Sequence, residues 1–148
     1  RYVRSQVDSD NTAEDLTAQV FFKALAGAGS FRGESSYKTW LFRIGHNVLS
    51  TWRTRRAKGA LVVEDLPENA DPTPCPATQA ITNEARSQVW KAVAGLPPVQ
   101  REVVSLRYLD ELSIEEIAQV QGRSRGAIRI LLHRARLRLR HTLEDHEL

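Results

Sequence analysis

Several residue types that would point to particular chemistries are scarce or missing in this chain of 148 residues. A single cysteine, Cys75, excludes a disulfide framework and any zinc site built from several cysteines. No apolar run approaches the roughly 18–20 residues that a membrane-spanning helix needs, and no basic start followed by an apolar stretch indicates a signal peptide. Methionine is absent even at the first position, so we expect the natural N-terminal end to be truncated before Arg1.

The residue patterns of common enzyme classes are missing as well. The four histidines show no metal-ligand spacing apart from His141 and His146, which lie in a polar tail. Cys75 has no histidine near it in sequence that could act as its base. No P-loop, dinucleotide-binding fingerprint or Gly-x-Ser-x-Gly motif occurs. We therefore expect a protein that is not an enzyme and that carries no cofactor and no metal ion.

Charge is distributed unevenly along the chain, although the net charge is only +3. Residues 1–60 contain 10 Lys and Arg against 5 Asp and Glu, residues 61–95 contain 2 against 5, and residues 96–148 contain 9 against 8. Residues 123–140 alone hold 7 arginines and no acidic residue. Two basic regions separated by an acidic segment are typical of a protein that touches a polyanion in two places. Solvated helix faces would produce a similar charge pattern.

Prolines divide the chain into two regions with helical patterns. Four of them fall within ten residues of the acidic segment: Pro67, Pro72, Pro74 and Pro76. Each proline removes a backbone donor and restricts the residue before it, so a continuous helix cannot form there. We therefore expect an all-α protein with two small helical domains, residues 1–60 and 84–148. An irregular linker over residues 61–83 would leave the domains free to change their relative position.

Apolar residues recur at helical spacing in two stretches of the first domain. The first stretch contains Leu16, Val20 and Ala24, with Phe21 and Phe22 expected to widen its buried face. The second begins near Ser36 and contains Trp40, Leu41, Ile44, Val48 and Trp52. Residues Thr12 to Asp15 resemble a helix-capping box before the first stretch.

The second domain has the pattern of a helix-turn-helix. A helix that starts near Pro97 would bury Val99, Val103 and Leu106. Ser113 and Glu116 form a capping box, Gly122 suits a turn with positive φ, and Ser124 can cap the last helix. That last helix would bury Ile128, Leu132, Ala135 and Leu139 and expose its arginines.

Motifs in both domains carry a resemblance to a known family. In the first domain they are Ala13-Glu14-Asp15-Leu16 with Gln19 and Phe22, Phe31-Arg32-Gly33, and Thr39-Trp40-Leu41-Phe42-Arg43-Ile44-Gly45-His46-Asn47. In the second they are Leu96-Pro97-Pro98, Arg101-Glu102-Val103, Leu106-Arg107-Tyr108, Leu112-Ser113, Glu116-Ile117-Ala118 and His133-Arg134-Ala135-Arg136. The two blocks resemble regions 2 and 4 of the extracytoplasmic-function (ECF) sigma factors of the sigma-70 family. They occur in the same order and cover nearly the whole chain.

The resemblance implies a bacterial, cytoplasmic transcription initiation factor that binds core RNA polymerase, through its clamp and flap, and promoter DNA. It also suggests an anti-sigma factor as a partner and no insertion into a membrane. Three residues match positions that contact core polymerase: Asp15, Gln19 and Phe22. The residues implied for the −10 element are Phe31, Arg43, Asn47, Arg53, Arg55 and Arg56. Those implied for the −35 element are Arg107, Ser124, Arg125, Arg129, His133 and Arg134.

The side-chain chemistry suits this division. An unpaired base is captured by stacking and edge contacts, and the Asn47 amide offers both a donor and an acceptor. In the last helix, Ile128, Leu132 and Ala135 would face the core and leave Arg129 and His133 on a neighbouring face for DNA. We therefore expect Arg129 to be the principal base reader.

Some features leave other interpretations open. Thr51 stands where the family often has Asp, and Ala127, Ile130 and Leu131 replace polar residues common in the family's recognition helix. Phe31 and Phe22 could simply pack on the core, and Ile130 with Leu131 could form an apolar patch for a protein partner. A helix-turn-helix regulator that acts without polymerase would explain residues 96–140, but not the motifs of the first domain.

Overall fold

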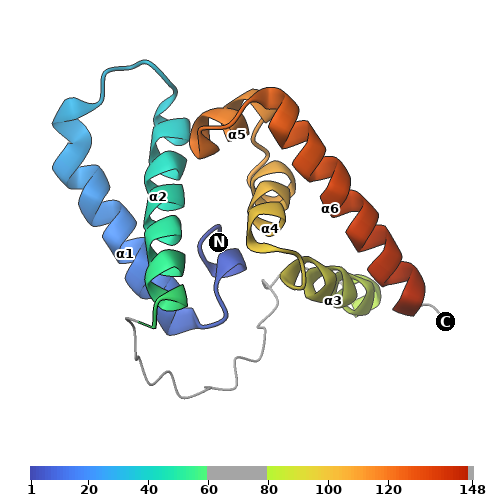
Figure 1. Cartoon of the computed structure of the whole chain (residues 1–148). Coiled ribbons are helices and arrows are strands. Elements are labelled where there is room, and N and C mark those ends of the chain that lie inside the picture. Colours follow the sequence, from blue (N-terminus) through green and yellow to red (C-terminus); the bar gives the residue numbers. More distant parts are fainter. Residues whose placement is uncertain (60–79, 147–148) are drawn as a thin grey trace.

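The computed structural model describes residues 1–59 and 80–146, and that part of the chain is all-α (Figure 1). The N-terminal lobe, residues 1–59, contains two 3-10 turns, η1 (Arg4–Gln6) and η2 (Ala28–Ser30), and two helices, α1 (Asp10–Gly27) and α2 (Tyr37–Ala57). The C-terminal lobe, residues 80–146, contains α3 (Ala80–Ala94), α4 (Pro98–Val104), the π-helical turn η3 (Ser105–Leu109), α5 (Ile114–Gln121) and α6 (Arg125–His146). No helix in these two ranges is long and apolar enough to cross a membrane.

The expected linker falls mostly outside the described residues. Helix α3 begins at Ala80, which is earlier than the expected domain start at residue 84. The earlier start is compatible with the sequence, because the last proline of the acidic segment, Pro76, precedes it. Residues 61–79 of the expected linker lie outside the described part of the chain.

Helix α1 differs from its sequence-based description at both its start and its surface. Its N-cap is Ser9, whose Oγ accepts the backbone N–H of Thr12 at 3.4 Å, so the predicted capping box at Thr12 is wrong. The apolar stripe is confirmed, because Leu16, Val20 and Ala24 are buried. Phe21 and Phe22 do not widen that buried face: their side chains are 55% and 74% exposed.

Helix α2 is buried on a broader surface than one stripe. Ser36 caps it by accepting the Thr39 N–H at 3.1 Å, as the sequence predicts. Val48 is buried, but so are Gly45 and Leu49 on an adjoining face. At Gly45 the backbone approaches Tyr2 closely, since a Cβ there would lie 3.1 Å from the Tyr2 ring and the ring would have to shift slightly. The helix is enclosed because it packs against α1 on one side and α5 on another (Figure 1).

The helix-turn-helix pattern of the second domain is confirmed in its details. The Ser113 Oγ accepts the Glu116 N–H while the Glu116 carboxylate accepts the Ser113 N–H, which completes the capping box. Gly122 ends α5 with φ at 64°, in the left-handed region that favours glycine. The predicted core residues Ile128, Leu132 and Ala135 are buried, as are Val103 and Leu106 of the preceding helix, whereas Leu139 and Val99 are only partly buried.

The two lobes pack directly against each other. Helix α2 contacts α5, and the N-terminal segment with η1 lies between α2 and α4 (Figure 1). Buried residues of both lobes form one hydrophobic cluster that extends from Tyr2 to Ala135. The sequence did not predict this interface, and free movement of the two domains stays a prediction.

Candidate nucleic-acid and polymerase interfaces

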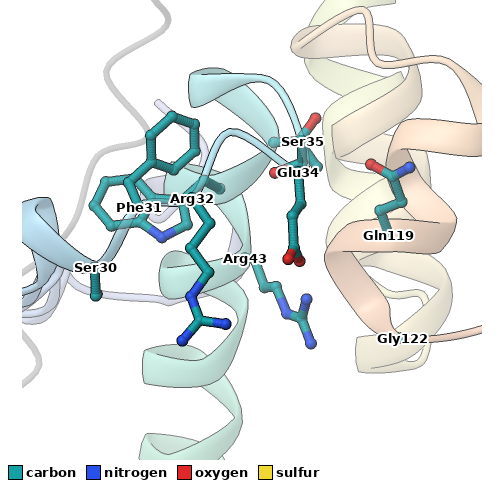
Figure 2. A pocket seen from close by; sticks show the side chains of 10 residues that line it. Ser30, Phe31, Arg32, Glu34, Ser35, Arg43, Gln119 and Gly122 are labelled. Carbon is teal, nitrogen blue, oxygen red and sulfur yellow. The ribbon is translucent and has the colours of Figure 1, made fainter.

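A cavity of about 450 Å³ is lined by the loop before α2, the first turns of α2 and the end of α5. Phe31 forms one wall of it, with its ring centroid 5.3 Å from that of Trp40 and 5.5 Å from that of Tyr37. Phe31 is therefore partly buried in an aromatic cluster at the cavity and is not part of the hydrophobic core. Figure 2 shows Arg32, Glu34 and Arg43 beside it, with Gln119 of α5 facing them.

The exposed side of α2 continues from this cavity. Arg43 and Asn47 are exposed and lie one turn apart, and Thr51 is exposed one turn further on. At the end of the helix Arg55 and Arg56 are exposed, and the Arg56 guanidinium lies 5.1 Å from the centroid of the Trp52 ring. These side chains form a polar and basic face that is open to a ligand.

Arg53 does not join that basic face. Its side chain is 21% exposed, and Nη1 lies 3.5 Å from Oε2 of Glu102 in the C-terminal lobe. Its Nη2 donates to Oε1 of Gln6 at 3.0 Å. The structure thus places Arg53 in the interface between the lobes, whereas the sequence grouped it with Arg55 and Arg56.

Glu102 is the centre of a buried polar cluster that the sequence did not reveal. Its carboxylate accepts the Tyr2 hydroxyl and lies 2.7 Å from Nδ1 of His46, in addition to its contact with Arg53. Gln6 extends the cluster by donating to the Ser105 hydroxyl at 3.0 Å. The only available signal was an acidic residue directly followed by two apolar ones, Val103 and Val104.

Burial and hydrogen bonding act in opposite directions on the Glu102 carboxyl. Burial by itself raises the pKa of this group, but the hydrogen bond and charge of His46, the Tyr2 hydroxyl and the charge of Arg53 outweigh that effect. The pKa of Glu102 therefore lies below its usual value. Burial, reinforced by the charge of Glu102, raises the pKa of the Tyr2 hydroxyl well above its usual range. The cluster thus contains an ionised carboxylate and a protonated tyrosine at neutral pH.

The surface of α6 carries most of the residues expected at the −35 element. Arg125, Arg129, His133 and Arg134 are all exposed. Ser124 is the cap of this helix, because its Oγ accepts the Ala127 N–H at 3.1 Å. Ile130 is 53% exposed and Leu131 packs partly against the core, so the two do not form one equally exposed patch.

Arg107 is engaged in a hydrogen bond within the turn before α5. Its Nη1 donates to the backbone oxygen of Leu112 at 2.9 Å, and the side chain is partly buried. The neighbouring Tyr108 instead reaches α6, where its hydroxyl accepts Nε of Arg136 at 2.9 Å. Arg107 thus supports the turn before α5 in this structure.

The residues expected to contact polymerase lie on one exposed face of α1. Asp15 and Gln19 are exposed one turn apart, and Phe22 follows with 74% of its surface exposed. Phe21 and Leu25 extend this face, and Leu25 at 79% exposure was not singled out by the sequence. Large apolar side chains grouped on a surface mark an interaction site for a protein partner. We call Phe21, Phe22 and Leu25 the α1 apolar patch.

No group of three or more His, Cys, Asp or Glu side chains in residues 1–59 and 80–146 is arranged to hold a metal ion. The arrangement instead provides an apolar patch, an aromatic-lined cavity and two basic helix faces. Such surfaces suit binding to protein and nucleic acid.

Comparison with known proteins supports this interpretation. The family model for Sigma-70 region 2 matches residues 1–59, and the model for Sigma-70, region 4 matches residues 86–139. RNA polymerase sigma factor YlaC of Bacillus subtilis is 36% identical over 134 residues, which cover 87% of this chain and 76% of that protein. ECF RNA polymerase sigma-E factor of Escherichia coli K12 is 32% identical over 140 residues, covering 82% of this chain and 69% of that protein.

Solved structures show a similar fold. The sigma factor RpoE of Bartonella quintana, solved in complex with the anti-sigma factor NepR, aligns with a TM-score of 0.77 and 26% identity, covering 97% of this chain and 88% of RpoE. CnrH in complex with the cytosolic domain of CnrY has a TM-score of 0.68 at 24% identity, covering 97% and 79%. Region 2 and region 4 matches in the expected order, with relatives above 30% identity, confirm the resemblance: the chain belongs to the ECF sigma factors of the sigma-70 family.

Proposed function

We propose that this ECF sigma factor binds core RNA polymerase through α1, contacts the −10 element through the loop before α2 and the exposed side of α2, and reads the −35 element through α6. The observation that carries the proposal is the presence of two separate exposed basic faces, one in each lobe, together with the α1 apolar patch. One lobe alone would suffice for a simple DNA-binding regulator. The protein would act in the bacterial cytoplasm, where its polymerase works, and would have no catalytic activity of its own.

The −10 assignment rests on the chemistry around the cavity. An unpaired base needs an aromatic surface for stacking and polar groups for its edge, and the strand beside it needs cations for its phosphates. Phe31 supplies the aromatic ring at the cavity, while the exposed Asn47 and Arg43 supply polar groups along α2. Arg55 and Arg56 then offer exposed positive charge at the end of the same helix.

The −35 assignment rests on α6 as the second helix of the helix-turn-helix. The first turns of a recognition helix enter the major groove. Arg125 and Arg129 lie in those turns with exposed side chains, while Ile128 and Leu132, on the neighbouring face of the helix, anchor it in the core. Ser124 and Arg107, both engaged within the protein, would contribute to the position of this helix.

Polymerase binding is supported by the α1 apolar patch. Its side chains would lose their exposure to water in a complex, which is favourable for apolar surface. The structure of RpoE was solved in complex with the anti-sigma factor NepR, and that of CnrH in complex with the cytosolic domain of CnrY. We propose an anti-sigma factor as a further partner of this chain on that basis.

Transcription with reconstituted core polymerase tests the proposal. Core polymerase with this chain should start transcripts at defined promoter positions, and mapping of their 5′ ends should locate −10 and −35 elements upstream. Phe22→Ser should weaken capture of core polymerase, whereas Lys23→Ser, at an adjacent exposed position of α1, should leave it unchanged. Binding to DNA without capture of core polymerase or defined starts would instead identify a helix-turn-helix regulator that is not a polymerase subunit.

A further inference from the structure

The contact between the two lobes is built around one buried carboxylate. Glu102 of α4 is 1% exposed, and its three side-chain partners, Tyr2, His46 and Arg53, all belong to the N-terminal lobe. Gln6 links the same cluster to Ser105. No comparable buried ion cluster joins any other pair of elements among residues 1–59 and 80–146, where the remaining ion pairs involve at least one exposed side chain.

The charged groups of such a cluster can separate, because water can replace their contacts with one another. A buried carboxylate and its cations give up hydration when the lobes close, and their attraction largely repays that cost. When the lobes separate, water can solvate Glu102, His46 and Arg53 again. The net free energy that these ion pairs contribute to lobe packing is therefore small, because desolvation offsets most of their attraction. A partner that binds the separated lobes more tightly can shift the equilibrium toward separation.

With the two lobes packed together, the protein cannot contact both promoter elements at the same time. This argument rests on the proposed function. Phe31 of the N-terminal lobe and Gly122 of the helix-turn-helix line the same cavity of about 450 Å³ (Figure 2). Elements at −10 and −35 are separated by about 25 base pairs, or roughly 85 Å of duplex at 3.4 Å per step. The lobes must therefore move apart before each can reach its own element.

We propose that Glu102, together with Tyr2, His46 and Arg53, forms a latch that holds the two lobes closed in the free chain and withholds Arg53 from nucleic acid until the lobes separate. Arg53 has two mutually exclusive partners in this scheme. When the lobes are closed, the Arg53 guanidinium contacts Glu102 of the C-terminal lobe; when they separate, that contact is lost and Arg53 joins Arg55 and Arg56 on the basic end of α2. The same residue thus couples lobe separation to binding of a phosphate backbone.

Distance measurements between spin labels test the latch without DNA or polymerase. Labels are attached at Lys23→Cys on α1 and Glu144→Cys on α6, both exposed positions, in a Cys75→Ser background. The otherwise unmodified chain should give one narrow distance distribution. Glu102→Gln should add a broad, longer component, because the loss of a hydrogen-bonded charge shifts an equilibrium by about tenfold or more. Glu115→Gln, which removes the same charge from an exposed position of α5, should leave the distribution unchanged.

A double-mutant cycle identifies the coupled pair. If Glu102 and Arg53 act together, the combined Glu102→Gln and Arg53→Gln chain should open no more than the more open single variant. Circular dichroism monitors helix content in each variant. Should Glu102→Gln lose its helices, Tyr2→Phe, which removes only the hydroxyl that donates to Glu102, is the deciding variant and should also increase the longer component. A broad distribution in the unsubstituted chain, an unchanged one in folded Glu102→Gln, or additive effects would overturn the latch.

Binding of a fluorescein-labelled single-stranded DNA 12-mer by the free chain tests the link to nucleic acid. Glu102→Gln should tighten binding severalfold, and adding Arg53→Gln should remove that gain. Lobes that separate without tighter DNA binding would overturn the withholding of Arg53. Because the distance distribution is read without polymerase, an intact latch in a chain that gives no promoter-specific transcripts would count against the proposed function alone.

Discussion

Asn47 occupies an exposed position in the middle of α2, between the cavity at Phe31 and the basic end of the helix. Asparagine is a weak helix former, and within residues 1–59 and 80–146 no hydrogen bond holds this side chain. Its free amide is instead available for the edge of a base. We therefore assign Asn47 to the ligand surface and not to the packing of α2.

Asn47→Ala should reduce open-complex formation while leaving capture of core polymerase and thermal stability nearly unchanged. Loss of hydrogen bonds to one base would lower the equilibrium constant for opening by about tenfold. Permanganate footprinting of the melted −10 region, compared with polymerase pull-down, measures the two effects. A lower melting temperature with normal promoter opening per folded molecule would instead make Asn47 a structural residue.

Arg129 and Arg134 on α6 are expected to differ in what they contribute to DNA binding. Arg129→Ala should relax base preference at the −35 element, at a cost of about 1–3 kcal/mol if the side chain contacts guanine through two hydrogen bonds. Arg134→Ala should weaken binding to all sequences alike and reduce the salt dependence by about one phosphate. Binding assays on −35 variants at several salt concentrations separate these outcomes. Unchanged base preference in Arg129→Ala would shift the readout to DNA shape or to other residues.

At the scale of the element, the N-caps determine where the helices begin and how much hydrogen bonding stabilises their first turns. The start of α5 has a reciprocal capping box between Ser113 and Glu116, with hydrogen bonds of 3.0 and 3.1 Å. The start of α1 has a single bond of 3.4 Å to Ser9. The backbone hydrogen bond from Ser113 is also the main reason why the pKa of Glu116 lies below its usual value.

Ser113→Ala should lower the free energy of unfolding by about 1 kcal/mol, because the Glu116 N–H at the start of α5 loses its acceptor and the bond from the Ser113 N–H to Glu116 loses its reciprocal partner. Ser9→Ala should cost less, since its hydrogen bond is longer and has no reciprocal partner. Urea denaturation of the whole chain, followed by circular dichroism, measures both. An equal loss in the two variants would show that the reciprocal bond from Glu116 adds nothing to the cap.

At the scale of the whole molecule, the packing of the lobes depends on the ionisation of Glu102. Four titratable or charged groups surround this carboxylate from the packed elements or lie beside it in α4: Tyr2, His46, Arg53 and Arg101. Because the pKa of Glu102 is lowered in the packed state, the ionised form stabilises packing at pH values above the usual glutamate value of 4.5. That contribution is lost as the pH falls below 4.5 through the lowered pKa.

The distance distribution between the labels on α1 and α6 should therefore broaden as the pH falls below 4.5. The pKa of Asp110 is raised, mainly by burial, so its protonation favours packing and acts in the opposite direction. Glu102→Gln provides the control, since it should be open already and should not broaden further on acidification. Acid-induced broadening that persists unchanged in Glu102→Gln would assign the effect to other carboxyl groups.

Local patterns in the sequence determined most of the secondary structure and the family. Helical spacing identified the buried stripes of α1 and α6, and short-range hydrogen bonds placed the caps at Ser36, Ser113 and Ser124. These signals act over three or four residues, so they are visible without any tertiary information. Because these signals are local, the sequence around Thr12 also fits a capping box, although the helix is capped three residues earlier by Ser9.

Only the tertiary structure decided which faces of those helices remain accessible. Phe21 and Phe22 fit the apolar pattern of α1 but are left uncovered, because α2 packs on a different side of the helix. Arg53 matches Arg55 and Arg56 in sequence but meets Glu102, 49 residues further along the chain. Tyr2 and Glu102 are 100 residues apart. Helical periodicity extends over a few turns and carries no information about partners at such separations, so the closed latch depends on how the two lobes pack.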